Sequence, residues 1–74
     1  MQDNVVWTSK LDDKYEVTVT RTDGYHGELT ISEGDLVHHR ESVGLSYGAL
    51  FGPDMADVAE WRRIAVEFVD GQKP

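Results

Sequence analysis

The spacing of apolar residues changes once along the chain, and this change constrains the fold more than any other feature of the sequence. From about residue 4 to residue 45 apolar and polar side chains alternate, which is typical of β-strands with one buried face. The apolar positions of this region are Val5, Trp7, Tyr15, Val17, Val19, Leu29, Ile31, Val37, Val43 and Leu45. From Pro53 to about Asp70 the spacing is that of an α-helix, which we expect Gly71 to end.

Turn-forming residues divide the alternating region into four strands. They lie at Asp12 to Lys14, Thr22 to Gly27 and Glu33 to Asp35, where hairpin connections are expected. The sequence therefore predicts an α+β fold, in which a four-stranded antiparallel β-meander is followed by one C-terminal α-helix packed on the face of the odd-numbered residues (ββββα). A bulge is expected near Ser42 to Gly44. We expect residues 1–74 to form a single domain, with a connecting loop at residues 46–52.

The helix carries more apolar surface than a small sheet can cover. At about 100° per residue its apolar side chains span an arc of roughly 220°, against a stripe of ~100° on most surface helices. Part of this arc is expected to contact something else. Ile64 is expected to be exposed, whereas Trp61 fits a core position and an interface position equally well. The predicted core contains Trp7, Val17, Val19, Leu29, Ile31, Val37, Val58, Trp61, Ala65 and Phe68.

The charge and size of the chain limit its partners. Fourteen acidic and seven basic residues give a net charge of −7, which repels phosphate backbones and anionic lipids, so no direct nucleic acid and no membrane is expected as a partner. A domain of 74 residues usually needs a disulfide, a metal or oligomerisation for stability, and the chain has no cysteine. We therefore expect a homodimer. The start of the chain lacks the features of a signal peptide, which favours a cytoplasmic location.

No set of residues with catalytic spacing is present. Gly44 to Gly48 matches the G-x-S-x-G pattern of a nucleophile elbow, but all three histidines precede Ser46, unlike the order in hydrolases with that elbow. His38 and His39 are neighbours on a predicted strand, so we expect their side chains on opposite faces, where they cannot hold one metal ion together. The sequence predicts a protein that is not an enzyme and has no cofactor and no metal site.

Two features are candidates for binding a protein partner. The connection from Leu45 to Gly52 is unusually apolar for a loop and contributes Tyr47, Leu50 and Phe51. The same residues fit a second interpretation, in which they fold back over the end of the core. The outer part of the helix contributes Arg62 and Ile64. A threonine-rich sheet face is most simply a result of β-propensity, but it also fits a flat docking surface.

Part of the sequence resembles known proteins. The run from Leu45 to Asp54, followed by Ala56-Asp57-Val58 and Trp61, is similar to a stretch of small uncharacterised proteins of actinobacteria and their bacteriophages. The resemblance covers about the last third of the chain. It implies a phage-encoded or accessory protein that acts on a host protein, and it supplies no catalytic residues.

These features predict a non-enzymatic, self-associating protein-interaction module that binds a host or cellular protein through Tyr47, Leu50, Phe51, Arg62 and Ile64. The alternative is an acidic inhibitor that mimics nucleic acid and occupies the binding groove of a basic DNA- or RNA-binding protein. Only the net charge motivates the alternative.

Overall fold

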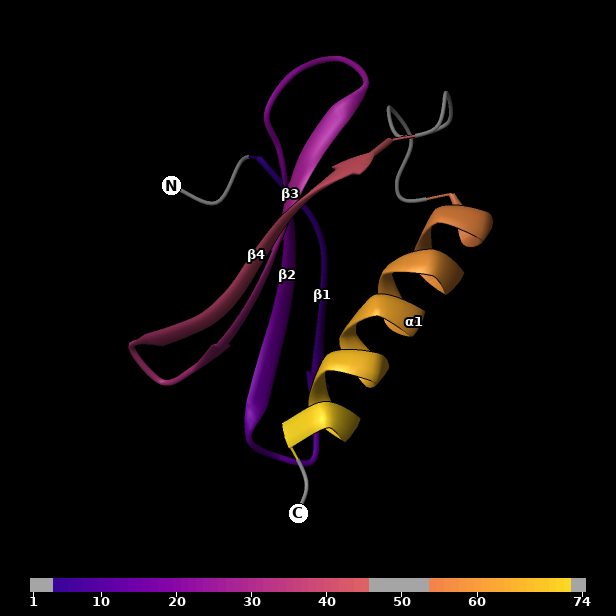
Figure 1. The fold of residues 1–74 in the computed structure, drawn as a ribbon. Helices are drawn as coiled ribbons and strands as arrows, with labels where there is room; N and C mark the ends of the chain where they lie inside the picture. The colour runs from indigo at the N-terminus through magenta and orange to yellow at the C-terminus, as the bar shows by residue number, and fades with distance from the viewer. Residues whose placement is uncertain (1–3, 46–53, 73–74) are drawn as a thin grey trace.

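The computed structural model describes residues 4–45 and 54–72 of the chain. It consists of four antiparallel strands in one sheet, in the order β1-β2-β3-β4, and one helix (Figure 1). The elements are β1 (Val5–Leu11), β2 (Tyr15–Arg21), β3 (His26–Glu33), β4 (Leu36–Gly44) and α1 (Met55–Gln72). The helix runs alongside β1 and packs on the sheet face that carries most odd-numbered residues. The predicted ββββα fold is confirmed.

The hairpin turns use residues that tolerate a positive φ angle. Between β3 and β4, Gly34 has a φ of 60° at the first position of a two-residue turn, where glycine is favoured. Between β1 and β2, Asp12 and Asp13 have φ angles of 57° and 54°, and the backbone N–H of Lys14 donates to the carbonyl of Leu11 over 3.1 Å. Aspartate adopts this conformation more readily than most residues, which explains the Asp-Asp pair in this turn.

The connection between β2 and β3 is closed by an aspartate side chain. The Oδ1 atom of Asp23 accepts a hydrogen bond from the backbone N–H of Tyr25 over 2.9 Å, and a carboxylate oxygen of Asp23 lies 2.9 Å from Nδ1 of His26. These two hydrogen bonds hold the pKa of Asp23 below its ordinary value, and the bond from the backbone N–H of Tyr25 has the larger effect. The ionised carboxylate is therefore the form that this turn requires.

Helix α1 begins at an aspartate cap. The Oδ1 atom of Asp54 accepts from the backbone N–H of Ala56 over 2.8 Å, and its carbonyl accepts from the N–H of Val58 over 2.9 Å. This is the bonding expected of an N-cap residue. The predicted end was wrong by two residues, because Gly71 and Gln72 still belong to the helix. In the described part of the chain no helix is long and apolar enough to cross a membrane.

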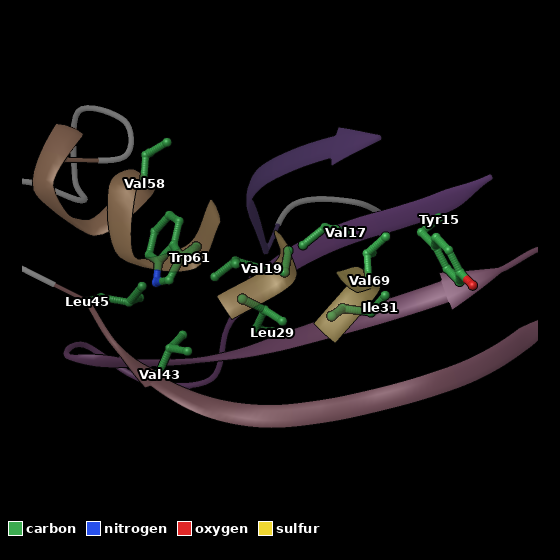
Figure 2. Close-up of a cluster of buried hydrophobic side chains, with 11 residues drawn as sticks. Tyr15, Val17, Val19, Leu29, Ile31, Val43, Leu45, Val58, Trp61 and Val69 are labelled. Atoms are coloured by element: carbon green, nitrogen blue, oxygen red, sulfur yellow. The ribbon is translucent and has the colours of Figure 1, made fainter. Parts of the chain in front are cut away.

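The core lies between α1 and the sheet (Figure 2). Seven of the ten predicted core residues are buried: Val17, Val19, Leu29, Ile31, Val58, Trp61 and Ala65. Trp7 and Phe68 are partly buried at its margin, and Tyr15, Val43, Leu45 and Val69 complete it. Trp61 is 1% exposed, which places it in the core rather than at an interface. No polar or charged side chain of the described residues is buried.

The prediction that Val37 belongs to the core was wrong, because β4 contains a bulge. Ile31 pairs with His39, but the next residue of β3, Ser32, pairs with Val37, so His38 is an extra residue on β4. Beyond the bulge the alternation of β4 is shifted by one residue. Val37 therefore points to the face away from the helix, and it is 42% exposed. The bulge predicted near Ser42 to Gly44 was thus misplaced, since pairing is regular there.

A second irregularity lies at the start of β1. Val5 pairs with Thr20 and Trp7 with Val19, so Val6 is the extra residue. Val6 packs against the core, whereas Val5, which the alternation assigned to the odd-numbered face, is not among the residues packed there. The remainder of β1, from Trp7 to Leu11, pairs regularly with β2.

Candidate binding surface

The structure describes two of the five residues predicted to bind a partner, and these two differ in their exposure to solvent. Tyr47, Leu50 and Phe51 lie outside the described residues. Arg62 is exposed, as a binding residue must be. The expectation for Ile64 was wrong, because this side chain is half-buried and packs against the core.

The helix carries an exposed stripe that the sequence analysis did not separate from the rest of the apolar arc. It consists of Met55, Ala59, Arg62 and Val66, which we call the helical stripe. Their spacing of four, three and four residues places them in one row on the helix surface. Met55 is 81% exposed and Val66 40%, and they are the two exposed large hydrophobic side chains in the described part of α1. One arginine among apolar side chains is a composition found at protein interfaces.

The position of Phe68 shows which way the stripe faces. Its ring lies 6.2 Å from that of His38 and 5.3 Å from that of His39, so this flank of the helix faces β4. At 100° per residue, the helical stripe lies on the opposite flank, roughly 140° from Phe68. The stripe therefore borders the outer side of β1, the strand beside which the helix runs.

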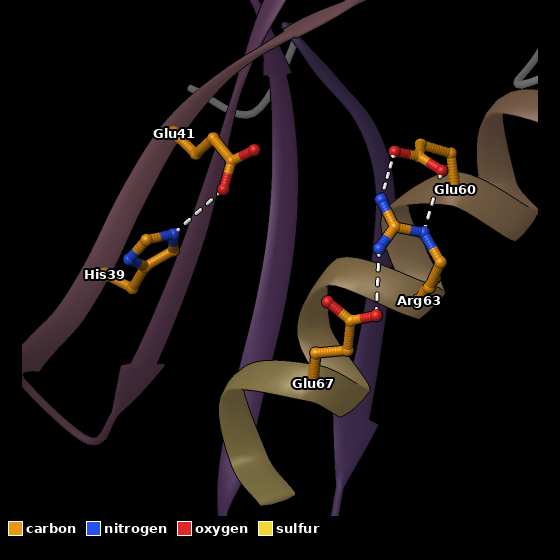
Figure 3. Close-up of polar contacts among 5 residues, drawn as sticks. All are labelled: His39, Glu41, Glu60, Arg63 and Glu67. Carbon is orange, nitrogen blue, oxygen red and sulfur yellow. Dashed lines mark hydrogen bonds and ion pairs between the residues drawn. The ribbon is translucent and has the colours of Figure 1, made fainter. Parts of the chain in front are cut away.

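The neighbouring arginine on the helix is bound to two carboxylates (Figure 3). Arg63 donates through Nε to Glu60 over 3.0 Å and through a terminal nitrogen to Glu67 over 2.9 Å. Hydrogen bonding to Arg63 lowers the pKa of Glu60, and the two carboxylates raise the pKa of Arg63. Arg62 has no carboxylate partner among the described residues, so its guanidinium remains available to another chain.

The two adjacent histidines lie on the same side of the sheet, contrary to the prediction. In the bulge of β4 both rings contact Phe68, and His38 also lies 5.5 Å from the ring of Tyr15. The Nε2 atom of His38 lies 3.1 Å from a carboxylate oxygen of Glu33. Figure 3 shows the contact of His39, whose Nε2 atom lies 3.0 Å from a carboxylate oxygen of Glu41. These contacts fix both rings over the end of the core, which is a structural role.

No group of three or more histidine, aspartate or glutamate side chains in residues 4–45 and 54–72 is placed to hold a metal ion. Each of the three histidines contacts a single carboxylate at the surface or at the margin of the core. The serine of the G-x-S-x-G motif lies outside the described residues.

The open face of the sheet carries a row of hydroxyl groups. Thr8, Thr18 and Thr30 are paired across β1, β2 and β3, and Arg40 continues the row on β4. The row is regular because paired residues of antiparallel strands point to the same face. Its use as a docking surface stays a prediction.

Comparison of the chain with protein-family models, with curated proteins and with solved structures finds no match. The helical stripe is therefore interpreted from its own chemistry.

Proposed function

We propose that the protein is a non-enzymatic, self-associating interaction module whose contact surface is the helical stripe. The observation that carries this proposal is the exposure of Met55 and Val66 on either side of Arg62, on a helix whose other large apolar side chains pack against the core. Contact with a second protein surface removes exposed apolar area of this kind from water, and this burial favours association.

The chemistry of the stripe favours a protein partner. The apolar side chains of Met55 and Val66 contribute contact area that imposes no specific geometry on the partner. The guanidinium of Arg62 favours a partner that offers a carboxylate or carbonyl oxygen. Ala59 lies between Met55 and Arg62 in the stripe, and its small side chain leaves room for the backbone or a side chain of the partner. The cost of desolvating Arg62 is moderate, because weakly hydrated guanidinium groups suit interfaces.

We further propose that the module acts in the cytoplasm on a host or cellular protein. Support comes from the resemblance of its last third to proteins of actinobacteria and their bacteriophages. The apolar residues Tyr47, Leu50 and Phe51 precede the helix in the sequence, and we propose them as further binding residues.

The test compares two glutamates on one helix. Val66→Glu adds a charge to the helical stripe, and Ala56→Glu adds the same charge at another exposed position of α1. Tagged wild-type protein and both variants are used as baits in a host lysate, with quantification of each captured protein. We expect at least one protein to bind the wild type and Ala56→Glu equally and to lose roughly tenfold or more in capture by Val66→Glu, which corresponds to about 1.4 kcal/mol. Equal capture by all three baits would refute the stripe as the contact surface.

The salt dependence of this binding separates the proposal from the acidic inhibitor. A nucleic-acid mimic relies on many carboxylates, so its affinity falls steeply as salt screens them. Binding through the helical stripe changes little with salt, because most of its area is apolar. Alanine at Leu50 and Phe51 tests the preceding segment in the same assay.

A further inference from the structure

We propose that the partner of the helical stripe is a second copy of this chain, joined by antiparallel pairing of the two β1 strands. This inference rests on the proposed function and names the partner of the same surface. It goes further in one respect, since it adds the outer edge of β1 to the interface.

The two edges of the sheet are different. β4 contains the bulge at His38 and a run of four titratable or charged side chains, His38 to Glu41, and both features oppose pairing with another strand. β1 pairs regularly from Trp7 to Leu11 and contains one charged residue, Lys10. No described segment pairs with its outer side. β1 is therefore the edge that is able to accept a strand.

The distribution of carboxylates favours the same edge. Each chain has a net charge of −7, so two copies repel each other unless they meet where carboxylates are absent. β1 is the strand without an acidic residue, whereas β2 contains Glu16, β3 contains Glu28 and Glu33, and β4 contains Glu41. The helical stripe also lacks an acidic residue. Thus neither β1 nor the four residues of the helical stripe contribute a carboxylate, and Asp70 is the first acidic residue beyond Val66 in the same row of the helix.

A twofold axis brings both parts of this surface together. If the axis stands perpendicular to the sheet beside β1, the two β1 strands pair in antiparallel orientation and both helices lie on the same face of one continuous sheet. The flanks of the helices that face the axis are those bordering the outer side of β1, which carry the helical stripes. The twofold axis thus gives the unpaired backbone N–H and C=O groups of β1 hydrogen-bonding partners, and it also brings the side chains of Met55 and Val66 into the interface.

The size of the chain is a further argument for a second copy. The part of the core that the structure describes contains eleven buried hydrophobic residues, and the chain has no cysteine that could form a disulfide. Domains of this size commonly gain stability by oligomerisation. Stable complexes bury about 1,200–2,000 Å² in total, and pairing through β1 adds the strand edge to the area of the helical stripe.

The experiment measures molar mass by light scattering at chain concentrations up to about 1 mM, at which weak dimers are populated. Hydrogen exchange of the β1 amides is recorded on the same samples. We expect twice the chain mass of 8.3 kDa for the wild type and for Ala56→Glu, and a single chain for Val66→Glu. Every second amide of β1 points away from β2, and these amides should exchange slowly in the dimer and rapidly in the Val66→Glu monomer.

Three outcomes would overturn the inference in distinguishable ways. A single-chain mass for the wild type at every concentration excludes the second copy and the self-association in the proposed function, whereas a loss of host-protein capture confined to Val66→Glu would still support the helical stripe as a surface that binds another protein. A dimer whose outward β1 amides exchange rapidly excludes strand pairing but retains the stripe. A dimer that survives Val66→Glu excludes the stripe, and with it the proposed function if capture is also unchanged.

Discussion

The ring of Trp7 on β1 lies against that of Trp61 on α1, with centroids 5.8 Å apart and planes inclined by 42°. Trp61 is 1% exposed, whereas Trp7 is partly buried at the margin of the core. The pair joins the helix to the strand beside it.

The Trp7–Trp61 contact should contribute a measurable coupling free energy. We expect Trp61→Leu to lower the free energy of unfolding by about 3 kcal/mol, because it removes a large buried ring. Trp7→Leu should cost about 1 kcal/mol, since its ring is only partly buried. Urea denaturation of both single variants and the double variant should give a coupling of about 0.5–1.5 kcal/mol. Additive losses would show that the two rings do not stabilise each other.

Deletion of His38 should leave the pairing of the sheet intact. Because His38 is the extra residue of the bulge, its removal places Val37 and His39 in regular alternation. The expected loss is about 1–3 kcal/mol, from the hydrogen bond to Glu33 and the ring contacts with Tyr15 and Phe68.

The control for this prediction is deletion of Thr18, which lies on the central strand β2 and pairs regularly with Thr8 and Thr30. That deletion shifts one side of the strand by a residue and turns its side chains to the other face. We expect it to unfold the protein, as seen by loss of amide dispersion in a two-dimensional NMR spectrum. Equal tolerance of both deletions would contradict the bulge assignment.

Gly27 should resist substitution by alanine. A Cβ atom at this position would lie 2.8 Å from the carbonyl oxygen of Thr20, and backbone must move to relieve that contact. We expect Gly27→Ala to cost about 1–3 kcal/mol, the range for overpacking. Gly44→Ala is the control, since nothing lies within 4 Å of its Cβ position and the change should cost little or be stabilising. Thermal unfolding monitored by circular dichroism distinguishes the two variants.

The turn before β3 should weaken in acid. The pKa of Asp23 is lowered in the folded state. Its contribution to the stability of the turn is therefore complete above the ordinary pKa of 3.8 and is lost as the pH falls through the lower, folded-state pKa. We expect the amide of Tyr25 to exchange faster below about pH 4. Asp23→Asn keeps an oxygen acceptor for this amide but does not titrate, so its Tyr25 exchange should lack this acid-dependent step. The same step in both proteins would assign it to another group.

The alternation of apolar residues was enough to predict the strands, the meander and the face that the helix covers. It succeeded because Val17, Val19, Leu29 and Ile31 lie on central strands, where a slip of one residue would exchange the buried and exposed faces. It failed at Val37 and Val5, which lie beyond bulges on the two edge strands. A bulge is stabilised by tertiary contacts such as those of His38 with Tyr15 and Phe68, and these join residues far apart in the sequence.

The binding surface was predictable only in part. The apolar arc of α1 indicated surplus apolar surface, but its centre could not be located from the sequence alone. Ile64 and Val66 both belong to this arc, and the structure turns Ile64 toward the core and Val66 to the solvent. The deciding factor is the rotation of the helix about its axis, which is set by the packing of Trp61 and Phe68 against the sheet.

The bulge of β4 also limits how far copies of this chain can assemble. A sheet that accepts strands at both edges can grow into a fibril, because each added copy offers a new edge. Here the residues from His38 to Glu41 block one edge, so pairing through β1 consumes the only pairable edge of each chain in its described part. In the proposed dimer the outer strands are both β4, so we expect the assembly to end at two copies.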